Sequence, residues 1–392
     1  MSDVVIVEAA RSAVGKKRGG LQHYPSPDLF ADVLRGAVDR TGIDSALVGQ
    51  VAGGCVSQVG MQSGNVTRSA WLAAGLDHRT AAFTVHTQCG SSQQAFTLAY
   101  GLVKSGVTEV AVAGGVESMN QVPMGSSTLP ELGTARTSRY QERYEVITQF
   151  EAAERIAEKW GITREDAERF AVLSQERAAR AIAEGRFTSQ IIPVEAPVVD
   201  ESGAVVGTKT VAVDEGPRAT TLESLAGLRL NLPDRPGGCV HTAGTSSQIS
   251  DGTSALVLTT EAKAAELGLR PRARVVDTLL VGSDPVLTLT GPIPATKALL
   301  ERTGLALEDI DVIEVNEAFA SIVLAWAQET KADLERVNVN GGAIALGHPL
   351  GGTGGILLTK ALYELERTGG RYGLVTMCVG GGQGTGTIIE RL

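Results

Sequence analysis

The chain is short of positive charge and of aromatic rings. It carries 35 Lys and Arg against 44 Asp and Glu, a net charge of −9, and only 4% of its residues are aromatic. Such a chain offers neither a positive field for a phosphate backbone nor platforms on which bases stack. Nucleic acid is therefore not expected as a partner, although local basic groups would still hold a small anion.

Cysteines and long apolar runs are also scarce. The four cysteines, Cys55, Cys89, Cys239 and Cys378, are far apart and form no Cys-x-x-Cys pair. This spacing predicts neither a disulfide framework nor a zinc ribbon, and free thiols fit a reducing compartment. The N-terminal segment MSDVVIVEAARSAVGKKRGG has too short an apolar run for a signal peptide, and no later run would span a bilayer. We expect a cytoplasmic protein without a membrane partner.

The residues that are present indicate a globular enzyme-sized chain. With 392 residues, 43% hydrophobic and 20% charged, it has the composition of two or three ordinary domains of about 150 residues each. Glycine is abundant, at 47 residues without a collagen period, against a usual share of about 7%. This excess predicts many tight turns and close backbone approaches.

Apolar and amphipathic segments alternate along the chain. The runs VVIVEA, LFADVLRGAVDRTG and VGQVAGGCV read as strand, helix and strand, which predicts βαβ units and a largely parallel sheet. The segment ALLERTGLALEDIDVIEVNEAFA repeats the order of VLRGAVDRTGIDSALVGQVAGGCV, with helix stops at Thr41-Gly42 and Thr303-Gly304. Two βαβ units can look alike by chance, but several elements recur in one order, so we favour an internal duplication.

The duplication predicts a division into domains. We expect an N-terminal half at residues 1–119 plus 247–269 and a C-terminal half at residues 270–392. Between them, residues 120–246 are richer in Ser, Pro and charge and contain the helical stretch FEAAERIAEKWGITREDAERFAVLSQERAARAIAEG. We interpret this segment as an inserted domain.

Cys89 lies in TVHTQCGSSQQAF, where an apolar strand ends and a helix begins. A thiol at a helix N-terminus meets the positive end of the helix dipole and free N–H groups, so we expect its pKa to be lowered. Those N–H groups would also bind an oxyanion. Taken alone, however, a free cysteine is more often a small buried hydrophobe.

Three further motifs carry candidate residues. Cys378 lies in LVTMCVGGGQGTG, where Gly380 would supply a backbone N–H; His348 lies in GGAIALGHPLGGTGG, and Asn316 lies in VIEVNEAFA. Singly, the histidine would be structural and the asparagine a helix cap. These three residues and Cys89 each follow a predicted strand, and open α/β sheets bind their ligands at the ends of strands. Their shared position favours one catalytic site over four independent structural roles.

The motifs CGSSQ, VNEAFA, GGAIALGHPLG and CVGGGQG, in this order, resemble the thiolase family over essentially the whole chain. The segments QFEAAERIAEKWGITRED and VNVNGGAIALGHPLG are most similar to the actinobacterial thiolases of steroid breakdown. The resemblance implies an α/β thiolase fold: duplicated βαβ halves in a five-layer αβαβα arrangement, with an inserted loop domain that binds coenzyme A.

The resemblance also implies roles for the candidate residues. Cys89 would be the nucleophile that takes up the acyl group, and Cys378 the acid and base. His348 would activate Cys89 and, with a water held by Asn316, form one oxyanion hole. The N–H groups of Cys89 and Gly380 would form the other. Breaking a carbon–carbon bond beside a thioester creates negative charge on a carbonyl oxygen, so preorganised donors are what this chemistry requires.

A second set of residues follows from the segment HTAGTSSQISDG, which resembles the family's coenzyme A segment. The resemblance places Ala243, Gly244 and Ser247 at coenzyme A, Phe319 beside the pantetheine, and Arg218 near the nucleotide phosphates. Coenzyme A would be a co-substrate, and the implied chemistry requires no metal and no permanently bound cofactor.

The chain departs from the family pattern beside the pocket. Ser92 replaces a common Gly, Gly351 a small residue or Cys, and Thr353-Gly354 a Ser-Gly pair. The segment at Thr148-Gln149 lacks the His-Met pair of short-chain biosynthetic thiolases. These changes bear on acyl-chain preference rather than on reaction class.

The sequence leaves three functions to compare. The first is a degradative thiolase that cleaves 3-ketoacyl-CoA with coenzyme A to acetyl-CoA or propionyl-CoA and a shortened acyl-CoA, with a steroid-derived or other bulky acyl group considered. The second is a biosynthetic acetyl-CoA acetyltransferase that makes acetoacetyl-CoA. The third is a non-catalytic acyl-CoA or lipid binder, which the four catalytic-type residues disfavour. A homodimer or homotetramer is expected from exposed apolar helices and from the resemblance.

Overall fold

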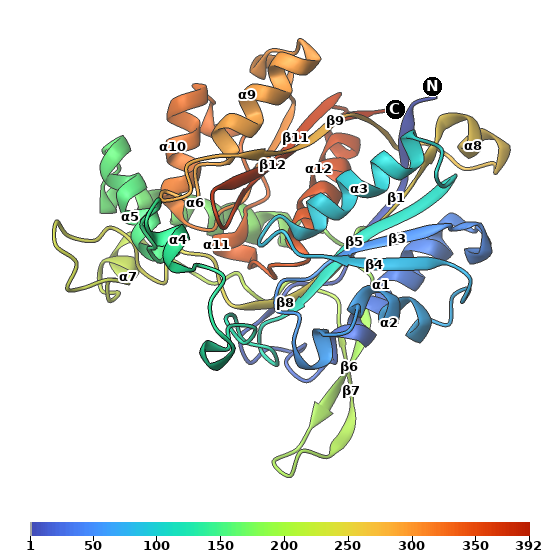
Figure 1. Ribbon diagram of the computed structural model, residues 1–392, viewed down its shortest axis with the longest axis horizontal. Helices are drawn as coiled ribbons and strands as arrows, with labels where there is room; N and C mark the ends of the chain where they lie inside the picture. The colour runs from blue at the N-terminus through green and yellow to red at the C-terminus, as the bar shows by residue number, and fades with distance from the viewer. Residues whose placement is uncertain (1) are drawn as a thin grey trace.

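The computed structural model describes residues 2–392. A ten-stranded sheet crosses the molecule in the order β10-β11-β12-β9-β1-β8-β5-β3-β4, with the short β2 beside β8 (Figure 1). Its N-terminal strands are β1 (Val4–Arg11), β2 (Gly15–Lys16), β3 (Gln50–Gly54), β4 (Ala81–Val85), β5 (Val110–Ser118) and β8 (Ser250–Thr260). Its C-terminal strands are β9 (Ala273–Gly282), β10 (Val312–Val315), β11 (Tyr372–Val379) and β12 (Gln383–Arg391).

The two groups of strands have the same topology. In the N-terminal group β3 is parallel to β4 and β5, and β8 is antiparallel to β5 and β1. In the C-terminal group β10 is parallel to β11, and β12 is antiparallel to β11 and β9. A parallel bridge from Ile313 to Val337 occupies the position that β4 holds in the first group. The predicted duplication is therefore confirmed in strand order and direction. The predicted largely parallel sheet is wrong, because among the described strands only β3 with β4 and β5, and β10 with β11, pair in parallel, and the remaining strand pairs are antiparallel.

A short antiparallel pairing of β1 with β9 joins the two halves into one sheet. Only Val5 with Arg274 and Ile6 with Ala273 pair directly. The sequence predicts a sheet in each half, and this join is a feature that local patterns do not reveal, because it pairs strands distant in sequence.

Helices complete a five-layer arrangement, as predicted. The helices α3 (Ser91–Lys104) and α12 (Thr353–Thr368) lie between the two halves and share one apolar core with strands of both. The N-terminal sheet is covered by α1 (Ser26–Thr41) and α2 (Val66–Ala73), and the C-terminal sheet by α9 (Pro292–Thr303) and α10 (Ala320–Thr330). Burial of these apolar faces from water is what holds the layers together.

Helices α1 and α9 end in the same way. Each ends at a glycine in the left-handed region, Gly42 at φ 73° and Gly304 at φ 70°. A residue with a Cβ is strained there, so the Thr-Gly pairs seen in the sequence mark true helix ends.

The segment between β5 and β8 packs on both halves and projects one hairpin. Its helices are α4 (Ser138–Gln141), α5 (Gln149–Trp160), α6 (Arg164–Ala183) and α7 (Leu222–Ala226), and its hairpin is β6 (Val194–Val199) with β7 (Val205–Val211) (Figure 1). Helix α5 contacts α10, and α6 contacts α11 (Ala343–Leu346). The short α8 (Glu261–Glu266) follows β8. Within residues 2–392, every helix is too short or too polar to cross a membrane.

Candidate active site

Cys89 lies in a tight turn between β4 and the first residue of α3. Gln88 adopts a positive φ of 44°, which an ordinary side chain rarely occupies. The turn is held by Ser91, whose Oγ donates to Gln88 O (2.6 Å) and accepts from Thr87 N (2.9 Å). The local sequence therefore fixes the thiol at the N-terminal end of the helix, as predicted.

The environment of the Cys89 thiol differs from the sequence prediction in one respect. Its side chain is buried, and burial raises its pKa to about 11, because the thiolate is poorly solvated there. The backbone N–H groups of Cys89 and Gly380 lie against the sulfur and oppose this rise. The expected lowered pKa is thus wrong for the free site: the N–H donors are present, but loss of water outweighs them.

His348 follows α11 on a loop that is wholly buried. Its Nδ1 lies 2.7 Å from Thr353 Oγ1, whose own proton is donated to Pro349 O (2.8 Å). Because that hydroxyl can only accept from the ring, Nδ1 carries the proton and Nε2 carries the lone pair. Burial lowers the pKa of His348 to about 4, so the ring is neutral near pH 7.

Asn316 connects His348 to Cys378. It follows β10, and Cys378 lies on the neighbouring parallel strand β11, so both side chains are at the same edge of the sheet. Asn316 Nδ2 lies 3.3 Å from His348 Nε2, and the same side chain hydrogen-bonds Cys378. Burial and the nearby Cys89 sulfur raise the pKa of Cys378 well above its ordinary value.

Four of the predicted residues line a common cavity of about 90 Å³. Cys89 and His348 face it together with Ser247 and Phe319, which come from the predicted coenzyme A set. Phe319 is fixed by edge-on ring contacts with Phe150 and His241. The structure therefore brings Cys89, His348, Asn316, Cys378 and Gly380 into one connected site.

The other residues of the predicted coenzyme A set lie outside this cavity. Gly244 is buried against Leu225, so close that a Cβ would be 2.4 Å from Leu225 Cδ2. Ala243 is exposed. Arg218 is also exposed and has no ion pair with the residues that the structure describes.

Two buried carboxylates next to the site were missed by sequence reasoning. Glu117 accepts from the backbone N–H groups of Val56, Ser57 and Gly351. Glu317, directly after Asn316, is also fully buried. A charged residue ordinarily indicates a solvated position, so nothing in the local pattern distinguishes Glu117, at the end of β5, or Glu317, just after β10. The sequence marks Thr353 only as a departure from the family pattern and predicts no role for it.

A larger groove of about 690 Å³ adjoins the cavity. Gly380 lines the groove, and Met124 and Gln149 line both spaces, so these two side chains stand between them. Gln149 Nε2 donates to Met124 Sδ at 3.7 Å. Tyr140 and Leu289 contribute to the mixed polar and apolar wall of the groove.

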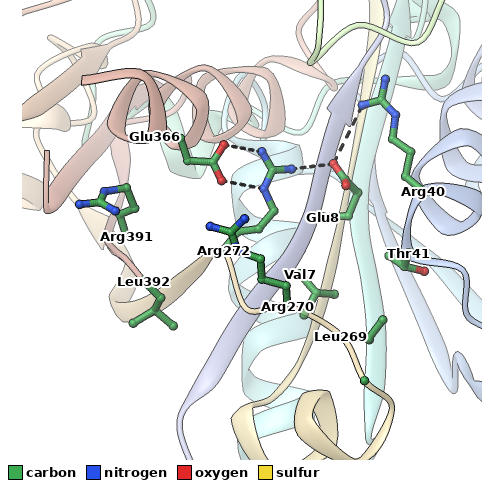
Figure 2. Close-up of a pocket in the computed structure, with 11 residues that line it drawn as sticks. Val7, Glu8, Arg40, Thr41, Leu269, Arg270, Arg272, Glu366, Arg391 and Leu392 are labelled. Atoms are coloured by element: carbon green, nitrogen blue, oxygen red, sulfur yellow. Dashed lines mark hydrogen bonds and ion pairs between the residues drawn. The ribbon is translucent and has the colours of Figure 1, made fainter. Parts of the chain in front are cut away.

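A separate pocket of about 580 Å³ lies where β1 meets β9 and contains none of the predicted site residues. Figure 2 shows Glu8 between Arg272 and Arg40, and Glu366 facing Arg272. Arg272 pairs with Glu8 and with Glu366 at 2.7 Å each. Because Glu8 lies on β1 and Glu366 on α12, this ion-pair network ties the two halves together.

The remaining cysteines also lie outside the cavity. Cys55 is fully buried in the core beneath α1 and α2, and burial raises its pKa strongly. Cys239 Sγ donates to Glu154 Oε1 at 3.0 Å. Neither thiol lines the cavity that Cys89 and His348 share.

The fold and these motifs define the class of the protein. Residues 4–262 match the thiolase N-terminal domain and residues 269–391 match the thiolase C-terminal domain. The chain belongs to the thiolase family and is an acyltransferase of that family, which confirms the resemblance read from the four motifs.

The chain is also similar to individual thiolases over its full length. The steroid 3-ketoacyl-CoA thiolase FadA6 of Mycobacterium tuberculosis is 49% identical, over 100% of this chain and 95% of that protein. A beta-ketoadipyl-CoA thiolase of Acinetobacter baylyi is 40% identical over 100% of both chains. Among solved structures, the Bacillus anthracis acetyl-CoA acetyltransferase superimposes with a TM-score of 0.89 at 38% identity, over 100% of this chain and 99% of that one. This likeness confirms the predicted thiolase fold.

Proposed function

We propose that the protein is a degradative thiolase, which cleaves a 3-ketoacyl-CoA with coenzyme A to acetyl-CoA or propionyl-CoA and a shortened acyl-CoA. The observation that carries this proposal is the meeting of Cys89, His348, Asn316 and Cys378 in one buried site. A nucleophile, a neutral base and a second thiol are the groups that reversible carbon–carbon cleavage beside a thioester needs.

In the first step the Cys89 thiol gives its proton to His348 Nε2, and the sulfur attacks the 3-keto carbon. The carbonyl oxygen becomes an oxyanion between the N–H groups of Cys89 and Gly380, which already lie against the Cys89 sulfur. Donors fixed in advance stabilise this charge without reorganising. Nδ1 of His348 stays bonded to Thr353, so Nε2 is the nitrogen that takes the proton.

The tetrahedral intermediate then breaks its carbon–carbon bond, leaving the acyl group on Cys89 and an acetyl-CoA or propionyl-CoA enolate. The protonated His348 Nε2 and a water held by Asn316 stabilise the enolate oxygen. Cys378 gives its proton to the enolate carbon; its raised pKa keeps it protonated until that moment. The Cys378 thiolate next takes the proton of coenzyme A, whose sulfur attacks the acyl-Cys89 thioester. The acyl group leaves on coenzyme A, and the Cys89 thiolate regains its proton from His348 Nε2.

The larger groove supports a bulky acyl group. Its volume of about 690 Å³ far exceeds that of the catalytic cavity, about 90 Å³, and Gly380 connects it to the oxyanion donors. The Mycobacterium tuberculosis relative that is 49% identical to this chain is named a steroid 3-ketoacyl-CoA thiolase. We therefore place a steroid-derived or similarly bulky acyl chain in this groove, and favour degradation over acetoacetyl-CoA synthesis.

The proposal also includes the ligand and assembly. Coenzyme A is the co-substrate, held by Ser247 and Phe319 at the cavity and by Ala243, Gly244 and Arg218 outside it, without a metal or permanent cofactor. The chain is a homodimer, or a homotetramer built from two dimers, in the cytoplasm. Its two halves are residues 1–119 with 247–269 and residues 270–392, and residues 120–246 form the coenzyme A domain.

Coenzyme A-dependent cleavage tests this function. Loss of the 3-ketoacyl-CoA enolate absorbance would be followed with acetoacetyl-CoA, a medium straight-chain substrate and a steroid side-chain substrate. We expect cleavage of all three, fastest for the bulky one, and none with Cys89→Ala. Cys55→Ala is the matched control, because Cys55 is buried away from the cavity, and should stay active. A wild type that binds these thioesters without cleaving any of them would favour the non-catalytic binder.

A further inference from the structure

Glu317 is a buried carboxylate that the mechanism above does not use. It has no exposed surface and accepts three hydrogen bonds: from Ser174 Oγ (2.7 Å), Asn338 Nδ2 (2.8 Å) and Ile344 N (3.1 Å). All three donors are uncharged. A carboxylate is buried at a cost in free energy, so a buried one that is fully bonded to neutral groups indicates a positional requirement.

The donors come from the segments that surround the catalytic loop. Ile344 lies in α11, which leads directly to His348. Ser174 Oγ also accepts from Gly342 N at 3.1 Å, so Glu317 holds the start of α11 at two points. Gly342 allows the close approach, because a Cβ there would be 2.3 Å from the Glu317 carboxyl carbon. Glu317 therefore joins the segment of Asn316 to the segment of His348.

Asn338 can present its amide to Glu317 in only one orientation. Its Oδ1 accepts from Val315 N (2.8 Å), and its Nδ2 donates to Val315 O (2.9 Å). Turning the amide over would break both bonds, so an N–H must face Glu317 Oε1. A carboxylate, which only accepts, satisfies Asn338, Ser174 and Ile344 together, whereas a glutamine would set an NH₂ group against a donor on one side.

We propose that Glu317 is a positioning residue that sets the contact between Asn316 Nδ2 and His348 Nε2, 3.3 Å in this structure. The inference rests on the proposed roles of Asn316 and His348. With Glu317 in place, β10 and α11 are held at a fixed separation, and the enolate site is formed before substrate arrives. Lys360 adds a second tie, since its Nζ bonds Glu314 Oε2 and Gly341 O at 2.7 Å each.

A double-mutant cycle separates positioning from a general loss of stability. Glu317→Gln keeps the volume and should lower kcat by about 10- to 100-fold, with KM for coenzyme A changed by less than about 3-fold, because misplacement of the enolate site affects the transition state. In an Asn316→Ala background the same substitution should change kcat by less than about 2-fold. Glu168→Gln, a buried carboxylate on α6 that pairs with Arg164 and does not contact the catalytic loop, is the matched control and should match wild type.

The outcomes are distinct. Equal losses from Glu317→Gln in both backgrounds, or no loss in either, would overturn the inference while leaving the proposed function intact. Full activity of Asn316→Ala by itself would instead contradict the proposed site. If Glu317→Gln does not fold, Ser174→Ala replaces it, because this variant keeps the carboxylate and removes one of its donors. Ser174→Ala should give a smaller fall in kcat, and that fall should disappear in the Asn316→Ala background. A fall in kcat that persists in that background would overturn the inference.

Discussion

Burial sets the resting protonation of the three titratable side chains at the catalytic site. It raises the pKa of Cys89 to about 11, raises that of Cys378, and lowers that of His348 to about 4. All three groups are therefore neutral near pH 7 before substrate binds. In the proposed mechanism, negative charge then develops on the ketone oxygen beside the N–H donors of Cys89 and Gly380 and on the enolate oxygen beside His348. Donors fixed in advance at a site without bulk water favour the transition state over the resting state.

The lowered pKa of His348 predicts a pH dependence of stability. An unfolded histidine titrates near pH 6.5, above the folded value of about 4. As the pH falls, the unfolded state therefore takes up the proton first. The contribution of neutral, buried His348 to the free energy of unfolding is complete above about pH 6.5 and is lost as the pH falls toward 4. Between about pH 7.5 and about pH 5 the free energy of unfolding falls by about 2 kcal/mol for this reason. Urea unfolding of wild type and His348→Asn at these two pH values should differ by that amount, and equal pH dependence of the two proteins would contradict it.

Thr353 should matter through its hydroxyl. The Oγ1 atom accepts the Nδ1 proton of His348 and donates to Pro349 O. Thr353→Val keeps the shape but leaves that buried N–H without a partner, so we expect kcat to fall by about 10-fold or more. Thr353→Ser restores the hydroxyl and should recover most of the activity. Steady-state kinetics of the two variants checks this, and equal activities would remove Thr353 from the mechanism.

At the scale of elements, the contact between α3 and α12 sets the distance between the two halves of the site. A Cβ on Gly354 would be 2.6 Å from Gln93 N, whereas Gly101, also within a helix, has open space around it. Gly354→Ala should therefore force the helices apart and lower the free energy of unfolding by about 1 to 3 kcal/mol. Gly101→Ala should raise it by about 0.5 to 1 kcal/mol through helix propensity. Denaturant unfolding of both variants measures the difference, and a stabilised Gly354→Ala protein would contradict this packing.

Much of the fold could be predicted because its signals are local. The Thr-Gly stops at Gly42 and Gly304 and the strand-end positions of Cys89 and Cys378 follow from short patterns, and the structure confirms them. The join of β1 with β9 could not be predicted, because it depends on two residue pairs far apart in sequence. The pKa of Cys89 was mispredicted for a related reason: helix position is visible in the sequence, whereas the depth of burial depends on the whole molecule.

The supporting polar groups were the least predictable part of the site. Cys89, His348, Asn316 and Cys378 stand in recognisable motifs, and the structure brings them together. Glu317 and Asn338 bond across the chain to Ile344 and Val315, and no spacing rule reports such contacts. Their roles, like those proposed for the catalytic residues, stay predictions for kinetics to test.

At the scale of the whole molecule, β4 ends the sheet, and one of its edges is unpaired within residues 2–392. Exposed edges invite pairing with another chain, and Leu98 on the neighbouring α3 is 38% exposed. If the proposed homodimer forms along this edge, Leu98→Glu should shift it toward monomer in sedimentation velocity. Val107→Glu, at an exposed position after α3, should leave the distribution unchanged. A dimer that withstands Leu98→Glu would place the interface elsewhere.

The central claim is that Cys89 carries the acyl group, and intact-protein mass spectrometry after incubation with acetyl-CoA tests it most directly. We predict a mass increase of one acetyl group on wild type, assigned by peptide mapping to Cys89, removed by added coenzyme A and absent from Cys89→Ala. Acetylation of Cys378 instead, or no adduct on a protein that still cleaves 3-ketoacyl-CoA, would contradict the account.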